Sequence, residues 1–109
     1  FIGFAAQDST GTTDTTLAVY LATDDVVGVG SIDDATAANA TGDVADVGDL
    51  LPLLQNVTDQ GAYIDHGNAA GNIDCCRIIR IHLRPGEVTA DQHVQYEFII
   101  EAAARQLAQ

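Results

Sequence analysis

The chain has 109 residues, of which 47% are hydrophobic. Its formal net charge is -12, because it contains 16 acidic side chains, four arginines and no lysine. This length fits a single domain, 1–109, with a core of its own, and the apolar content is too high for a disordered acidic tail. A negative field of this size repels phosphate backbones and anionic membranes, and no apolar run is long enough to cross a bilayer. We therefore expect neither nucleic acid nor a membrane as a partner.

Residues 1–16 are predicted to form an extended N-terminal arm. The arm begins with the apolar side chains of Phe1, Ile2 and Phe4 and continues with the polar, turn-forming segment Gln7–Asp14. An exposed apolar tip on such a stem has to dock on another surface. That surface is either the core of the same chain or a neighbouring subunit.

Two strands are predicted after the arm. The continuous apolar run Leu17–Ala22 indicates a buried strand. The segment Val26–Gly30 is a second candidate, and its glycines indicate a bulge or a close approach of two backbones. Residues 31–42 are small and polar, which favours a loop.

A short helix is predicted near 43–51, where aspartates recur at every third residue and apolar residues occupy the other side. Gly48 weakens this helix, and Pro52 is expected to end or kink it. A short strand is predicted at Ala62–Ile64, between turn-forming residues.

The strongest pattern is a predicted antiparallel hairpin of Cys75–Leu83 with Val94–Ala102, joined by a segment that starts with a Pro-Gly turn. If Leu83 pairs with Val94, one register gathers apolar pairs on one face and an Arg–Glu pair on the other. The pairs expected from this register are Ile81–Tyr96, Ile79–Phe98, Arg77–Ile100, His82–Gln95, Arg80–Glu97 and Cys76–Glu101. A helix starting at Thr89 is the competing interpretation, because 89–92 resembles a capping box.

The C-terminal tail, 101–109, is predicted to be a short helix, with Glu101 and Arg105 at a favourable spacing. It is too short to be stable alone, so it docks, frays or joins a partner. The whole chain is thus expected to be mainly β, a compact antiparallel domain with a C-terminal hairpin and two short helices, although an α+β fold remains open.

The charge is unevenly distributed along the chain. Residues 1–74 hold 12 acidic side chains and no arginine, whereas residues 75–109 hold all four arginines and four acidic side chains. Such asymmetry indicates either a contact surface between proteins or local pairing of the arginines. We predict partner binding by the apolar ends and the arginines of the hairpin, namely Phe1, Ile2, Phe4, Arg77, Arg80, Arg84 and Leu107.

No motif predicts catalysis, a metal site or a cofactor. His66 follows Asp65, and such a pair can act as a general base, but no spacing fixes a further partner. The two adjacent cysteines, Cys75 and Cys76, lack the spacer that zinc sites show, even with His66 and His82 nearby in sequence. We expect them to be free, partly buried thiols, since neighbouring side chains on a strand point to opposite faces.

The aspartates do not follow a calcium-binding loop pattern. The groups considered are Asp43, Asp46 and Asp49, the pair Asp24 and Asp25, and the pair Asp33 and Asp34. The alternating oxygen ligands that end in a bidentate glutamate are absent from all of them. A solvated acidic surface is therefore the default interpretation.

The combination of an apolar and then Thr/Gly-rich arm, Phe1 to Thr16, with the β-prone segment Val26 to Gly30 resembles small capsid decoration (cement) proteins and other minor structural proteins of tailed viruses. The resemblance implies a non-enzymatic structural protein on the virion, synthesised in the host cytoplasm, that binds a capsid or tail protein and forms homo-oligomers. It assigns no residue a role. The alternative is a small exported or halophilic ligand-binding domain, or a small enzyme that uses Asp65 and His66.

Overall fold

The computed structural model describes residues 3–5, 19–55, 62–68 and 70–105, and these residues form a mainly β protein, which confirms the expected fold class. The strands are β1 (Gly3–Ala5), β2 (Val19–Leu21), β3 (Gly28–Asp33), β4 (Leu50–Gln55), β5 (Ala62–Asp65), β6 (Asp74–His82) and β7 (Gln95–Ile100). Three single 3-10 turns accompany them: η1 (Ala37–Asn39), η2 (Val44–Asp46) and η3 (Ala102–Ala104).

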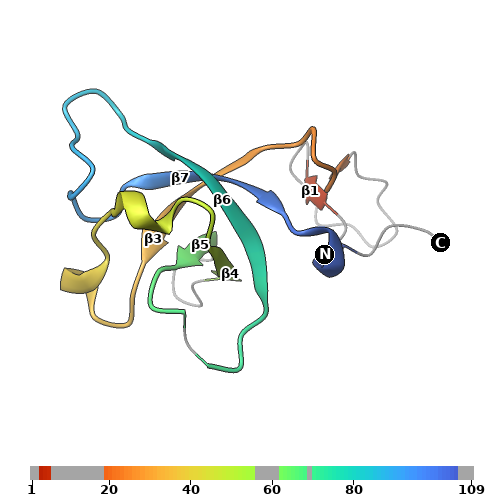
Figure 1. Cartoon of the computed structure of the whole chain (residues 1–109), viewed down its shortest axis with the longest axis horizontal. Helices are drawn as coiled ribbons and strands as arrows, with labels where there is room; N and C mark the ends of the chain where they lie inside the picture. Colours follow the sequence, from red (N-terminus) through yellow and green to blue (C-terminus); the bar gives the residue numbers. More distant parts are fainter. Residues whose placement is uncertain (1–2, 6–18, 56–61, 69, 106–109) are drawn as a thin grey trace, which may run out of the picture.

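Five of the strands close into a barrel in the order β3-β5-β4-β6-β7, while β1 and β2 form a separate two-stranded ribbon (Figure 1). All pairings are antiparallel except that of β3 with β5, where Ile32 lies opposite Ile64. Strand β3 also pairs with β7, so it joins the two edges that the other four strands leave open. The parallel pairing departs from the all-antiparallel sheet that the sequence predicts.

The core of the barrel is built by alternating side chains, as the hairpin pattern predicts. Along the last strand and the residue before it, Val94, Tyr96, Phe98 and Ile100 are at most 3% exposed. They pack against buried side chains of the other barrel strands, such as Ile78 of β6. Complete burial of an aliphatic side chain of this size stabilises the fold by about 1.5–3 kcal/mol.

The predicted register of the hairpin is confirmed over its first half. Three predicted cross-strand pairs are present: His82–Gln95, Ile81–Tyr96 and Arg80–Glu97. A β-bulge at Ile79 then shifts the register by one residue, so that Ile78 instead of Ile79 faces Phe98. The prediction for the second half was therefore wrong. The bulge buries Ile78 to 1% exposure and turns Ile79 outward to 39%.

The predicted helix near 43–51 is present only as the single 3-10 turn η2. The Asp43 carboxylate accepts a hydrogen bond from the backbone N–H of Ala45 at 2.9 Å, which caps this turn. Gly48 then adopts a φ of +94°, a conformation that ends helical structure and favours glycine. The C-terminal helix is likewise reduced to η3, and residues 106–109 lie outside the described part of the chain.

The last two residues of the predicted helix, Leu50 and Leu51, belong to strand β4, which continues through Pro52. Proline cannot donate to a sheet ladder, and it is tolerated here because the pairing of β4 with β6 shifts register between Leu51 and Pro52. The amphipathic spacing of this segment was therefore a poor guide. Leu51 is buried because it lies on a strand, not on a helix face.

Both predicted N-terminal segments contain a strand, but the burial of the first and the bounds of the second differ from the prediction. The run Leu17–Ala22 contains β2, but all three β2 side chains are exposed, so the prediction of a buried strand was wrong. The strand predicted at Val26–Gly30 begins later and continues to Asp33. The predicted strand at Ala62–Ile64 is present as β5.

Replacing Gly42 with alanine is expected to destabilise the protein. A Cβ atom at this buried position would lie 2.1 Å from the backbone oxygen of Thr89 and 2.7 Å from Val94, so the segment would have to move away from the β6–β7 connection. We expect a loss of about 1–3 kcal/mol in the free energy of unfolding, measured with urea. Gly30→Ala is the control, because its Cβ would meet only ordinary contacts at 3.5 Å. Equal losses in the two variants would contradict the packing described for Gly42.

Candidate functional site

The ribbon of β1 and β2 is attached to the barrel through Phe4. The ring of Phe4 lies against that of Phe98, with 6.0 Å between the centroids and 56° between the planes. This distance is within the range of favourable aromatic pairs. Gly28 allows the contact, because a Cβ atom there would lie 2.5 Å from the Phe98 ring. The apolar arm thus docks on its own core at Phe4, whereas Phe1 and Ile2 lie outside the described residues.

The other strand of the ribbon presents apolar side chains to solvent. Val19, Tyr20 and Leu21 are 43%, 61% and 52% exposed. Val27 and Val29, at the start of the barrel, are also exposed. A run of three exposed apolar residues on one strand is a feature of binding surfaces rather than of ordinary solvated strands.

The ribbon is a two-stranded sheet of its own, separate from the barrel. Within the described part of the chain, β1 and β2 pair only with each other, whereas every barrel strand has two neighbours. A strand edge with free N–H and C=O groups can add a further strand from another protein. In Figure 1 the ribbon lies at one end of the long axis beside η3, and the β6–β7 connection lies at the opposite end.

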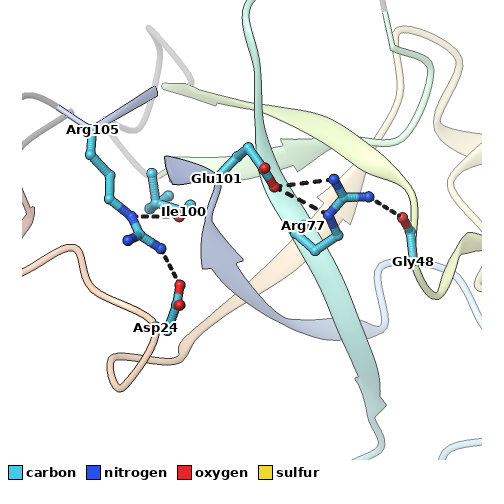
Figure 2. Close-up of polar contacts among 6 residues, drawn as sticks. All are labelled: Asp24, Gly48, Arg77, Ile100, Glu101 and Arg105. Atoms are coloured by element: carbon cyan, nitrogen blue, oxygen red, sulfur yellow. Dashed lines mark hydrogen bonds and ion pairs between the residues drawn. The ribbon is translucent and has the colours of Figure 1, made fainter. Parts of the chain in front are cut away.

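Two arginines fix the C-terminal end of β7 next to the ribbon (Figure 2). Arg77 donates to Glu101 Oε2 from Nε at 3.2 Å and from Nη2 at 3.1 Å, and to the backbone oxygen of Gly48 at 2.7 Å. Arg105 donates to the backbone oxygen of Ile100 at 2.9 Å and to the carboxylate of Asp24. Because Asp24 lies in the turn that follows β2, Arg105 ties the C-terminal segment to the end of the ribbon.

The other two arginines also have carboxylate partners. Arg80 Nη2 donates to Glu97 Oε2 at 2.8 Å, and hydrogen bonds from His82 and then Arg80 hold the pKa of Glu97 below its ordinary value. Arg84 Nη2 donates to Glu87 Oε2 at 2.7 Å. The hydrogen bonds from Arg84 lower the pKa of Glu87 to about 2.

All four arginines of the chain are therefore paired with its own carboxylates. Three pairs lie within residues 75–109, in agreement with the interpretation of local pairing, whereas Arg105 pairs with the distant Asp24. Three of their partners are the only glutamates of the chain, and the fourth is Asp24. The net charge of -12 therefore corresponds to the other aspartates of the chain. Partner binding by Arg77, Arg80 and Arg84 stays a prediction, and Leu107 lies outside the described residues.

His66 finds its carboxylate partner across the fold and not in the adjacent Asp65. His66 Nε2 lies 2.9 Å from Asp46 Oδ2, and the Tyr96 hydroxyl donates to the same oxygen at 2.5 Å. That hydroxyl in turn accepts from the backbone N–H of Asp43 at 3.0 Å. Burial, followed by the hydrogen bond to Asp46, raises the pKa of Tyr96 above its ordinary value. The trio joins η2 and β5 to β7, and Tyr96 is fixed as a hydrogen-bond donor.

The histidine, cysteine and aspartate residues that were considered as metal ligands do not come together in the described part of the structure. Among the described residues, no group of three or more His, Cys, Asp or Glu side chains is arranged to hold a metal ion. Several of the candidate aspartates have local partners instead. Asp43 caps η2, Asp46 binds Tyr96 and His66, and Asp33 accepts from the backbone N–H of Asp34 at 2.8 Å.

The sequence did not predict three features of this region. They are the exposure of the β2 side chains, the hydrogen bonds of Asp46 to Tyr96 and His66, and the contact of Arg105 with Asp24. Asp46 and Arg105 bond to residues 50 and 81 positions away, and no local pattern encodes such contacts. For β2 a signal exists, because its run is short and follows a polar segment, but apolar content alone does not distinguish a buried strand from an exposed one.

Comparison with known proteins gives no relative: no family model, no curated protein and no solved structure matches the chain. In the part of the chain that is described, no helix has the length and apolar content needed to cross a membrane.

Replacing Tyr96 with phenylalanine is expected to lower the free energy of unfolding by about 1–3 kcal/mol, because it leaves the amide of Asp43 and the carboxylate of Asp46 without their shared partner. Urea unfolding measures the loss. Tyr20→Phe removes the same hydroxyl from an exposed position and should change the stability by less than about 0.5 kcal/mol. Similar effects of the two substitutions would show that the buried hydroxyl does not hold η2 on the barrel.

Proposed function

We propose that the chain is a non-enzymatic structural protein that docks on a protein partner through the ribbon of β1 and β2. The observation that carries this proposal is the exposure of all three β2 side chains on a ribbon outside a closed barrel. A barrel that has no free edge needs no partner strand for its own stability. Exposed apolar side chains are costly in water and become favourable when a partner covers them.

The charge of the chain supports a partner of a particular chemistry. Asp24 and Asp25 lie in the turn that follows β2, where Asp24 is paired with Arg105 and Asp25 has no arginine partner among the described residues. An apolar surface flanked by carboxylates is complementary to an apolar groove with arginine or lysine at its rim. The same charge opposes direct contact between two copies of the ribbon, since like charges would approach each other.

The setting that we propose is a virus particle, in which the chain binds a capsid or tail protein and stabilises the assembly. The proposal rests on the traits that resemble decoration proteins, together with the docked ribbon. In such an assembly many copies bind one repeated partner, so that weak individual contacts become effective through multivalency. We also propose that the chain forms homo-oligomers. A measurement of its molecular mass in solution tests this part of the proposal.

The double variant Tyr20→Asp, Leu21→Asp is expected to lose binding while the barrel stays folded, because both side chains are more than half exposed. Aromatic and aliphatic residues at the centre of an interface often contribute 2 kcal/mol or more each. We therefore expect the affinity for the particle to fall by at least about a hundredfold. Co-sedimentation of the purified chain with particles measures the affinity, and circular dichroism checks the fold.

The matched control is Leu83→Asp, Val88→Asp, which adds the same two charges at exposed apolar positions of the β6–β7 connection. This variant should bind as the unmodified chain does. Equal loss in both double variants would mean that added charge, not the ribbon, governs binding. If the unmodified chain stays in the supernatant as a monomer at all particle concentrations, the assembly function is wrong.

A further inference from the structure

Two sulfur atoms lie side by side at the junction of β4 and β6. Cys75 and Cys76 are free and buried, and their Sγ atoms are 3.8 Å apart. Neighbouring side chains of a regular strand point to opposite faces, so this proximity needs a cause. The cause is the register shift beside Pro52, because Leu51 pairs with Cys76 and Pro52 pairs with Asp74. Cys75 is left as the extra residue of a bulge, and a bulge redirects its side chain.

The pair does not suit a disulfide. The Cα atoms of adjacent residues are about 3.8 Å apart, below the roughly 4.4–6.8 Å that unstrained disulfides span. A bridge here would strain the backbone at a point where the oxygen of Cys75 accepts from the backbone N–H of Glu101 at 2.8 Å. The fold therefore favours the reduced dithiol over the oxidised form.

Cys75 opens onto a groove that is lined mostly by apolar residues. Cys75 lines a cavity of about 650 Å³. The other residues that line it are Leu53, Leu54, Gly71, Asn72, Ile73, Ala103, Ala104 and Arg105. This groove is separate from the ribbon, and nothing in the proposed function uses it. It has room for an organic group next to the sulfur atoms.

The distance between the sulfur atoms fits one soft atom bound to both. With sulfur bonds of about 2.3 Å, as for zinc, two sulfur atoms 3.8 Å apart subtend an angle of roughly 110° at the central atom. A metal ion usually requires more ligands than two, and the described residues provide no group of three. A trivalent arsenic atom that carries one organic substituent needs only two sulfur atoms.

We propose that Cys75 and Cys76 form a dithiol site for organic compounds of trivalent arsenic, with the organic substituent in the groove. An arsenic–oxygen group reacts with two thiols, so that two As–S bonds form, the As=O bond breaks, and the two thiol protons leave with the oxygen as water. Arsenic remains trivalent, and no oxidant or reductant takes part.

The order of the two steps follows from the surroundings of each sulfur. The hydrogen bond from Cys76 and a further one from the backbone of Leu53 lower the pKa of Cys75 to about 6, although burial opposes this shift. The same hydrogen bond and burial raise the pKa of Cys76. Cys75, which faces the groove, attacks first as a thiolate, and Cys76 then closes the ring as its proton leaves.

The test is a titration of the full chain with phenylarsine oxide, followed by intact mass. We expect one adduct that survives an excess of glutathione, a monothiol, and is released by dithiothreitol, a dithiol. In Cys75→Ser and Cys76→Ser the remaining sulfur should bind at least about tenfold more weakly, because the second bond is intramolecular only in the unmodified chain. An adduct that glutathione removes from the unmodified chain would overturn the proposal.

A second measurement keeps the test valid if a serine variant does not fold. A ligand that binds the folded state in preference to the unfolded state raises the thermal midpoint. The midpoint of the unmodified chain should therefore rise with saturating phenylarsine oxide. A lower midpoint would mean that the reagent reaches the sulfur atoms only by unfolding the protein, and the site would be wrong.

Discussion

Closure of the barrel by β3 is the constraint on which the rest of the structure depends. This strand pairs in parallel with β5 and antiparallel with β7, and in doing so it joins the two halves of the sheet. Closure removes the exposed strand edges that would otherwise invite aggregation. The barrel strands are all paired on both sides, whereas in the described part of the chain each strand of the ribbon has a single neighbouring strand.

Two irregularities on β6 decide which side chains reach the core. At Ile79 the bulge against β7 turns one isoleucine outward and places its neighbour, Ile78, inside. At Cys75 the bulge against β4 brings a second sulfur next to that of Cys76. The first bulge preserves the packing of the barrel, and the second creates the dithiol. Both show that a strand can depart from strict alternation where it pairs with two neighbouring strands at once.

The sequence predicts local features of this fold well and long-range ones poorly. The register at Arg80 and Glu97 follows from side-chain pattern, because apolar and charged pairs agree on it. The bulge at Ile79 that ends this register has no counterpart in the hairpin pattern. The parallel pairing of β3 with β5 is likewise invisible in a sequence whose neighbouring strands all favour antiparallel hairpins.

The candidate site follows the same rule. An apolar arm that has to dock is predictable from Phe4, but not that its ring meets Phe98, 94 residues further along the chain. The helix expected near 43–51 failed because three aspartates imitate helical spacing, while Gly48 and the bulge at Pro52 determine the actual backbone. The spacing of apolar and polar residues does not predict such backbone features, because they depend on the pairing of strands that are distant in sequence.

We propose that a closed, self-sufficient barrel carries a ribbon that a protein partner covers. Native-state amide hydrogen exchange of the free and particle-bound chain tests it most directly. We expect slow exchange in β6 and β7 in both states, and fast exchange at Val19–Leu21 that becomes slow on binding. Ribbon amides that are as protected in the free chain as those of the barrel, or that stay unprotected in the bound chain, would contradict the account.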